Sequence, residues 1–306
     1  MIRIGVLRGG TSARYTDSLG SGAFVLRSLP RDKYEPVDVF VDPDGVWHIG
    51  GKPVSYDMLR HRVDVLWNAL HGFYGEDGKV QQMLESLGIP YVGSGPLASS
   101  IAMNKKLSKE SLATVGIETP RGMYIESWGD GDRDETVATV VSTIARKFSP
   151  PWIVEPISRA RAAGAVRPAT RDELTLVLSD MFDLRIPVSV EEAVFGRELS
   201  VVAVRGFREE PIYTFPARYI DDPEARVTHA ASEEIQELAK KIHNALHLGH
   251  YSRLEAIVTP KGKVCVTAVE TMPNTGPVSD LHHALASTGV SFREFAEHLI
   301  ELARAK

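Results

Sequence analysis

Short apolar runs alternate with helical stretches in the first third of the chain, and no other feature constrains the fold as strongly. Residues 2–7, 34–41 and 63–70 are apolar and rich in β-branched side chains, which is typical of buried strands. Stretches with helical patterning at 22–29 and 80–87 separate these runs. Because strands that alternate with helices indicate βαβ units, we expect an α/β fold with a parallel sheet.

The residues that follow two of these strands predict a ligand site. Residues 9–12 read Gly-Gly-Thr-Ser, and residues 71–78 begin with His-Gly and end with Gly-Glu-Asp-Gly. Ligands of open α/β sheets bind beyond the carboxyl ends of the strands. We therefore predict that Gly10 and His71 lie close together at that edge of the sheet.

The pattern changes after residue 95, and we expect three modules with the bounds 1–97, 98–187 and 188–306. The second module is predicted to contain helices at 99–115, 136–147 and 171–181, a polar loop at 127–135 and a strand at 152–154. The third is predicted to contain a strand at 199–206, an extended segment at 212–219, helices at 232–246 and 291–304, and a hairpin at 253–269.

Composition excludes several classes of protein. The chain has 306 residues, of which 43% are hydrophobic, so it can bury a large core. A net charge of −5 and a single short arginine-rich stretch at 158–171 argue against nucleic-acid binding. The only cysteine, Cys265, can form no internal disulfide, and no run approaches the ~20 apolar residues of a membrane span. We expect a cytoplasmic protein without a membrane partner.

Four motifs occur in order between residues 68 and 105: Asn-Ala-Leu-His-Gly, Gly-Glu-Asp-Gly, Gly-Ile-Pro-Tyr-Val-Gly-Ser-Gly and Ala-Ser-Ser-Ile-Ala-Met-Asn-Lys. Shorter motifs accompany them at 9–13 (Gly-Gly-Thr-Ser-Ala), 196–201, 253–255 and 271–273. This series resembles the D-alanine–D-alanine ligases of the ATP-grasp superfamily. The resemblance spans almost the whole chain and is dense between residues 63 and 105.

The resemblance implies a three-module ATP-grasp fold, the use of ATP and magnesium, and a homodimer. It also implies a reaction in peptidoglycan precursor synthesis. In that reaction ATP phosphorylates the carboxylate of one D-alanine, and the amine of a second D-alanine attacks the acyl phosphate. Positioning and cations that neutralise phosphate charge lower such a barrier.

On the amino-acid side, the resemblance assigns His71 to substrate and acyl-phosphate binding and Glu76 to the orientation of its ring. A carboxylate on one ring nitrogen fixes the tautomer, which leaves the other nitrogen for the ligand. The structural alternative is a loop histidine that is satisfied by backbone groups. The complete motif around both residues favours the functional interpretation.

The first glycine loop, which contains Gly10, departs from the family pattern. Where the family has a glutamate that holds the ammonium of the first D-alanine, this chain has Arg14. Asp17 lies three residues further, on the same face of the expected helix, and is a candidate for the missing carboxylate. Ser18 matches a family serine. Arg14 is either a solvated surface charge or a ligand of a substrate carboxylate.

Later motifs supply further candidates on the same side. Arg218 and Tyr219 match a lysine–tyrosine pair of the family's lid loop, and the alternative is that they pack on the surface. Arg253 matches a catalytic arginine. Ser279 and Leu281 are the counterparts of residues that end the site for the substrate carboxylate.

The expected nucleotide side carries unusual charges. Lys105 matches the first phosphate-binding lysine, but Glu155 stands where the second lysine is expected. Two like charges ~4 Å apart at an effective dielectric of 20 repel by about 4 kcal/mol, or roughly three decades of affinity. Arg159 and Arg161 follow in a loop that the family fills with serine and glycine. They are either replacement phosphate ligands or signs of a lost nucleotide loop.

Four further residues match the strand that contacts adenine and ribose in the family: Glu191, Glu192, Val194 and Glu198. Glutamates on a strand are often only exposed, so this assignment depends on the resemblance.

The hairpin at 253–269 predicts a metal site independently of the resemblance. A turn at 259–262 places Arg253 opposite Ala268 and Glu255 opposite Val266. Opposed residues share a face of the sheet, and the same face continues to Glu270. The carboxylates of positions 255 and 270 suffice for one weakly held magnesium ion with several waters. The alternative is an ion pair between the arginine and these glutamates.

Three functions remain open at this point. The first is D-alanine–D-alanine ligation with weakened use of ATP. The second is a catalytically weak ATP-grasp relative that binds a ligand or a partner. The third is a ligase for another pair of amino acids, because Arg14 stands where the amine of the first substrate is bound.

Overall fold

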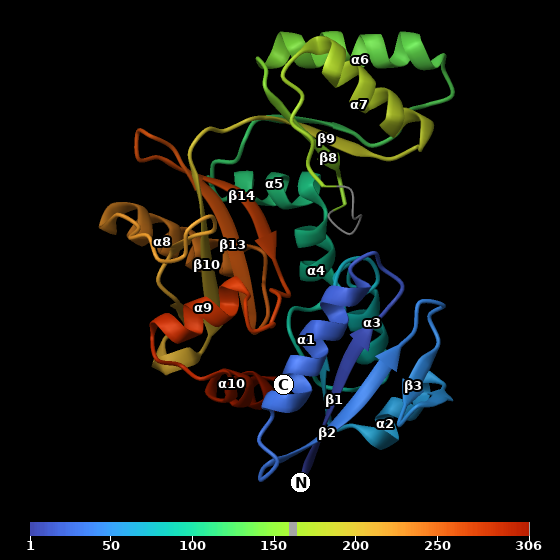
Figure 1. The fold of residues 1–306 in the computed structure, drawn as a ribbon, viewed down its shortest axis with the longest axis vertical. Coiled ribbons are helices and arrows are strands. Elements are labelled where there is room, and N and C mark those ends of the chain that lie inside the picture. The colour runs from blue at the N-terminus through green and yellow to red at the C-terminus, as the bar shows by residue number, and fades with distance from the viewer. Residues whose placement is uncertain (159–163, 306) are drawn as a thin grey trace.

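The computed structural model describes residues 1–158 and 164–305, which form three sheets stacked along the long axis of the molecule (Figure 1). The first sheet has the order β4-β3-β2-β1-β5-β6. Its strands are β1 (Ile2–Gly9), β2 (Tyr34–Val41), β3 (Trp47–Ile49), β4 (Lys52–Val54), β5 (Val65–Asn68) and β6 (Tyr91–Val92). β1 pairs in parallel with β2 and β5, and β5 pairs in parallel with β6, which confirms the predicted parallel sheet.

The helices of the first sheet are α1 (Tyr15–Ser28), η1 (Tyr56–Met58), α2 (Leu59–Arg62) and α3 (Lys79–Ser86). The prediction started the first helix at residue 22, which is wrong, because helical structure begins directly after the glycine loop. Gly22 lies inside the helix, where an added Cβ would lie 2.5 Å from the Cβ of Arg8. The missing side chain of Gly22 therefore lets α1 pack closely on β1, and the glycine does not mark the start of the helix.

The second sheet has the order β7-β9-β8 and is antiparallel. It consists of β7 (Gly122–Ile125), β8 (Trp152–Pro156) and β9 (Val188–Glu192), covered by α6 (Arg133–Lys147) and α7 (Arg171–Asp183). The loop that was expected at 127–135 ends earlier, because Asp132 caps α6 by accepting a hydrogen bond from the N–H of Glu135.

The third sheet has the order β11-β10-β13-β14, with β12 beside β10. Its strands are β10 (Arg197–Arg205), β11 (Ile212–Thr214), β12 (Arg218–Tyr219), β13 (Tyr251–Val258) and β14 (Val264–Glu270). The short helix η2 (Phe207–Glu209) follows β10, and α8 (His229–Ala245) packs on the sheet. Among the described residues, no helix combines the length and apolar character needed to cross a membrane.

The helix predicted at 99–115 is interrupted, and the interruption places a candidate site residue. α4 (Pro96–Met103) ends at Asn104, which has extended backbone angles, and α5 (Lys105–Thr114) begins after it. The side chain of Asn104 caps α5 through the N–H of Leu107. The N–H of Lys105 donates to the carbonyl of Ile157, so the start of α5 is bonded to the segment that follows β8.

The predicted register of the hairpin is wrong, although its face is as predicted. Arg253 pairs with Glu270, and Glu255 pairs with Ala268. Ala256 pairs with Val266, but a bulge between Glu255 and Ala256 shifts the register by one residue. Because of this shift, Glu255 lies opposite Ala268, on the expected face. The four residues of the predicted site therefore share one face because of an irregularity that hydrophobic periodicity does not encode.

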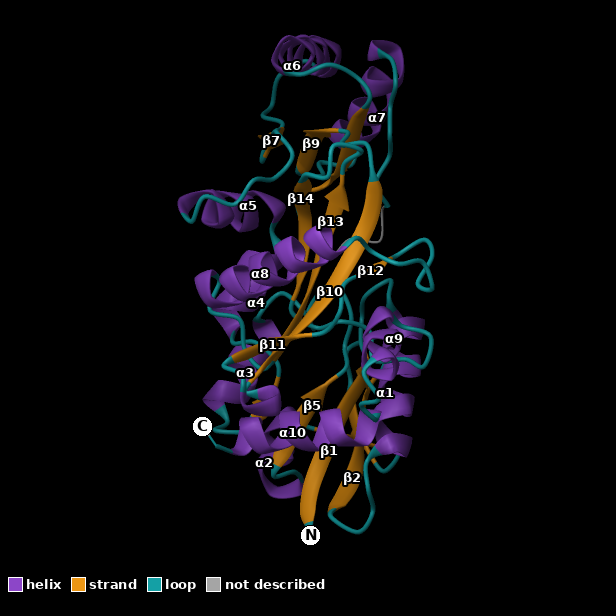
Figure 2. Ribbon diagram, turned by 90° about the vertical axis from the view of Figure 1, so that its left-hand side faces the viewer, coloured by secondary structure: helices purple, strands orange, loops and turns teal. Residues whose placement is uncertain are grey.

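The end of the chain packs against its beginning. α9 (Asp280–Ser287) and α10 (Phe292–Arg304) follow the third sheet, and α10 contacts β5 and β6 (Figure 2). One core cluster joins the first sheet and α10 to the C-terminal half of β10 and the first residue of β13. A second core joins the third sheet to α4, α5 and α8. The module boundaries near 97 and 187 stay a proposal.

We predict that Phe295→Ala lowers the free energy of unfolding by about 3–5 kcal/mol, because Phe295 is fully buried between α10 and the first sheet and its removal leaves a cavity. Urea titration measures the loss. The matched control is Leu176→Ala on α7, where the side chain is exposed and a change within about 0.5 kcal/mol is expected. Equal losses for both variants would contradict the role assigned to α10.

Candidate active site

The glycine loop and the loop after β5 meet at the carboxyl edge of the first sheet, as predicted. Ser12 Oγ donates to the carbonyl of His71, and an added Cβ on Gly10 would lie 3.2 Å from the side chain of Leu70. Ser18 Oγ accepts from the N–H of Gly9 at 2.8 Å and donates to the carbonyl of Ala69 at 2.8 Å. Ser18 is fully buried, so its place in the structure is a link between the two loops.

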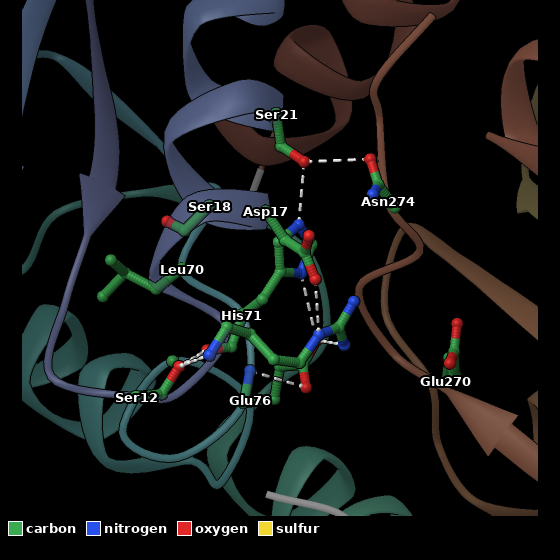
Figure 3. Close-up of polar contacts among 12 residues, drawn as sticks. Ser12, Asp17, Ser18, Ser21, Leu70, His71, Glu76, Glu270 and Asn274 are labelled. Carbon is green, nitrogen blue, oxygen red and sulfur yellow. Dashed lines mark hydrogen bonds and ion pairs between the residues drawn. The ribbon is translucent and has the colours of Figure 1, made fainter. Parts of the chain in front are cut away.

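The ring of His71 is buried and both of its nitrogens have partners (Figure 3). Nδ1 lies 3.3 Å from Glu76 Oε1, and Nε2 lies 2.8 Å from Ser21 Oγ. Ser21 also donates to Asn274 Oδ1 at 3.0 Å, which connects α1 to the loop after β14. The predicted contact between His71 and Glu76 is therefore present, and the other ring nitrogen has Ser21 as its partner.

Arg14 lies between two hollows. One of about 90 Å³ also contains Glu76 and Glu270, and one of about 220 Å³ also contains Arg253 and Ser279. The guanidinium of Arg14 lies 3.1 Å from Asp17 and 3.9 Å from Glu76. Asp17 is half exposed and lines neither hollow, so its carboxylate neutralises Arg14 from the outside.

One guanidinium holds three carboxylates between β13, β14 and the start of α9. Arg253 donates to Glu270 at 2.9 Å and to Glu255 and Asp280. The two predicted metal ligands, Glu255 and Glu270, thus both pair with the arginine. In the described part of the chain, no group of three or more histidine, cysteine, aspartate or glutamate side chains could hold a metal ion.

A larger cavity of about 400 Å³ lies between the second and third sheets. It contains the predicted nucleotide contacts Lys105, Glu155, Glu191, Glu192, Val194 and Glu198. Ile153, Ile220 and Ile257 add apolar wall, and Arg167 adds a second cation. Glu255 and Ala268 line the same cavity, so the hairpin face borders it. Arg159 and Arg161 lie outside the described residues.

Two lysines of α5 pair with carboxylates at this cavity. Lys105 Nζ contacts Glu155 and lies 3.4 Å from Glu191, while Lys109 Nζ lies 2.6 Å from Glu191. Burial raises the pKa of the Glu191 carboxyl, but the two ammonium groups outweigh it and the pKa is lowered. Burial lowers the pKa of the Lys109 ammonium more than Glu191 raises it. Glu155 thus forms an ion pair with Lys105, the lysine that the sequence predicts to bind phosphate.

Several predicted residues have local partners instead of a place in a cavity. Tyr219 is buried, with its ring 3.6 Å below the Arg197 guanidinium, and Arg218 donates to the carbonyl of Pro223. Neither lines the three cavities described above.

The remaining predicted residues keep a place at a cavity. Glu192 pairs with Arg121, whose hydrogen bond holds the pKa of that carboxyl below its usual range. Ser279 lines the hollow of about 220 Å³ and caps α9 by accepting from the N–H of His282. Leu281 is buried at the edge of the same hollow.

Four residues that were not predicted from the sequence contribute to the site: Ser21, Lys109, Asn274 and Asp280. Ser21 lies three residues after Ser18, and Lys109 lies four residues after Lys105, so helical spacing contained a signal for both. The contact of Asp280 with Arg253 and that of Asn274 with Ser21 bring together distant segments, and no local pattern indicates them.

Comparisons with known proteins agree over the whole chain. The family model for the D-ala D-ala ligase C-terminus matches residues 112–301, and that for the N-terminus matches residues 51–94. The D-alanine–D-alanine ligase of Geobacter sulfurreducens is 33% identical, over 99% of this chain and 95% of that protein. The ligase of Aquifex aeolicus is 30% identical, over 98% of this chain and 100% of that protein.

Solved structures give the same result for the fold. The D-alanine–D-alanine ligase of Coxiella burnetii has a TM-score of 0.90 at 22% identity and covers 100% of this chain and 96% of its own. The Bacillus anthracis ligase, solved in complex with ATP, has a TM-score of 0.80 at 28% identity and covers 99% of this chain and 97% of its own. The α/β fold is thus that of the ATP-grasp ligases, and the chain belongs to the D-alanine–D-alanine ligase family.

Proposed function

We propose that this protein joins two amino acids, D-alanine in the first instance, at the expense of ATP for peptidoglycan precursor synthesis. One observation carries the proposal. A single face of the β13–β14 hairpin borders both kinds of cavity: Glu255 and Ala268 line the large one, and Arg253 and Glu270 line the smaller ones. A phosphoryl group transferred along this face passes from a nucleotide to a carboxylate without leaving the site.

The side chains on this face suit a reaction that creates negative charge. Arg253 has a planar, permanently charged guanidinium, which stabilises a developing oxyanion or a phosphoryl oxygen. Arg14 offers a second cation at the wall of the smaller hollows. The contribution of the protein is to hold the two reactants in line and to neutralise charge.

The large cavity fits the nucleoside part of ATP better than its phosphates. Apolar walls from Ile153, Val194 and Ile257 suit a planar base, and Glu198 suits ribose hydroxyls. On the phosphate side, Lys105 is paired with Glu155 and lies 3.4 Å from Glu191. Phosphate binding therefore requires that Lys105 exchange Glu155 for a phosphate, so we propose that ATP binds weakly.

Magnesium fits the described residues only in part. Glu255 and Glu270 are hard oxygen ligands, but both already neutralise Arg253. A magnesium ion that accompanies the nucleotide takes most of its ligands from phosphate oxygens and water. We propose that these two carboxylates contribute at most weakly to its binding.

Two other functions are kept as alternatives. A ligase for a different amino acid pair is favoured by Arg14, which lines both hollows where a carboxylate is expected to hold an ammonium. A catalytically weak relative that binds a ligand or a partner is favoured by the pairing of Lys105 with Glu155. A cytoplasmic location and a homodimer complete the proposal, and light scattering of the purified protein tests the latter.

We predict that Glu155→Gln tightens the binding of Mg-ATP about tenfold, because the uncharged amide no longer competes with phosphate for Lys105. Calorimetry with Mg-ATP measures the dissociation constant. Glu126→Gln is the matched control, since Glu126 is an exposed partner of Lys106 outside the cavity. Unchanged binding in Glu155→Gln would mean that the carboxylate does not oppose the nucleotide.

We also predict that turnover with D-alanine lies well below the ~10 s⁻¹ that is typical of enzymes. Release of ADP, measured beside the dipeptide product, gives this rate. Replacement of the guanidinium in Arg253→Met should lower kcat/KM by a further factor of about 10²–10³. Arg293→Met serves as the control, because Arg293 pairs with Asp32 and Glu297 outside the site. A wild-type rate near the typical value would refute the proposed weakening.

A further inference from the structure

A series of polar contacts runs from the loop after β14 to the wall of the smaller hollows (Figure 3). Asn274 Oδ1 lies 3.0 Å from Ser21 Oγ, which lies 2.8 Å from His71 Nε2. His71 Nδ1 lies 3.3 Å from Glu76 Oε1, which lies 3.9 Å from the Arg14 guanidinium. Asn274 and Arg14 both line the hollow of about 220 Å³, so the series begins and ends there.

The hydrogens of this series can be counted, beginning at Asn274. The N–H of Gly276 lies 2.7 Å from Asn274 Oδ1 and can only donate, which fixes the orientation of the amide. The hydroxyl of Ser21 has one hydrogen and donates it to the same oxygen. Ser21 Oγ can then only accept from His71, so Nε2 carries a hydrogen.

The other ring nitrogen faces a carboxylate. Glu76 Oε2 accepts from the N–H of Gly72 at 3.0 Å, and the cation of Arg14 lies near Oε1. Both partners favour the ionised carboxylate, which only accepts. Nδ1 of His71 therefore carries a hydrogen as well. We propose that Asn274 is a positioning residue that holds His71 as a buried imidazolium.

The charge of the ring matters for its neighbours. Glu76 is shared between two cations, His71 and Arg14. The further ionisable groups near it are Asp17, Tyr251 and Glu270, and Glu270 is itself paired with Arg253. Burial raises the pKa of Tyr251, so that phenol stays neutral and supplies no competing charge. If His71 loses its charge, Glu76 attracts Arg14 more strongly and draws its guanidinium away from the hollow of about 220 Å³, which Glu76 does not line. Asn274 thereby controls how freely Arg14 meets the carboxylate of a substrate, a consequence that rests on the proposed function.

Nitrogen NMR of histidine side chains in the unliganded full chain at pH 7.0 tests the proposal, with His71 assigned through His71→Gln. The wild type should show two protonated ring nitrogens. In Asn274→Ala the hydroxyl of Ser21 is released and donates to Nε2, so the ring should become the neutral tautomer with its hydrogen on Nδ1. Asn274→Asp keeps the acceptor and should keep the imidazolium. Asn244→Ala, an exposed asparagine on α8, is the control.

A neutral ring in the wild type, or an unchanged ring in Asn274→Ala, would overturn the proposal. Kinetics add an independent measurement. KM for D-alanine should rise about tenfold in Asn274→Ala, the size of one charge-assisted contact, while kcat changes little. Asn274→Asp should restore KM, and a loss of kcat at constant KM would refute the link to Arg14. Because NMR needs no substrate, a wild type without ligase activity would count against the proposed function alone.

Discussion

The guanidinium of Arg253 is the interaction on which the rest of the site depends. It joins β13 through Glu255, β14 through Glu270 and the first turn of α9 through Asp280. Removing the partner of a half-buried charge is costly, because the remaining carboxylates would repel one another without compensation. The same contact fixes the loop between β14 and α9, which brings Asn274 to Ser21 and so connects the third sheet to the first. The cluster around Arg253, which the sequence indicates as catalytic, therefore also holds the loop between β14 and α9 in place.

The two halves of the site differ in how they handle charge. Around His71 and Arg14, each carboxylate has a cation within reach and cavities remain beside them. Around Lys105, the cations and carboxylates of α5, β8 and β9 satisfy one another. An internal carboxylate that pairs with a lysine competes with an external phosphate for the same ammonium. Under the proposed function, the hollows beside Arg14 can accept a ligand directly, whereas a phosphate at Lys105 has to displace Glu155.

How far the sequence predicts this structure depends on the range of the interactions involved. Alternating apolar runs correctly predict the parallel sheet and the meeting of Gly10 with the loop of His71, because both follow from local periodicity. The break at Asn104 and the bulge beside Glu255 were missed, since each depends on a partner strand that a periodic pattern does not specify. Asp280 and Asn274 were missed for the same reason. Family motifs located Lys105 and Glu155, but their direct contact is visible only in three dimensions.

The return of α10 to the first sheet has a consequence for synthesis of the chain. Phe292, Phe295, Leu299 and Ile300 lie near the C-terminus, yet they fill the core under strands that are made first. Domains generally fold as they leave the ribosome, N-terminal parts first. α1 covers part of the same apolar face early, but the part of the first sheet that α10 covers stays exposed until α10 has been translated. The interval between the two events is the period in which the nascent protein is most exposed to aggregation, and a chain truncated before α10 would never leave it.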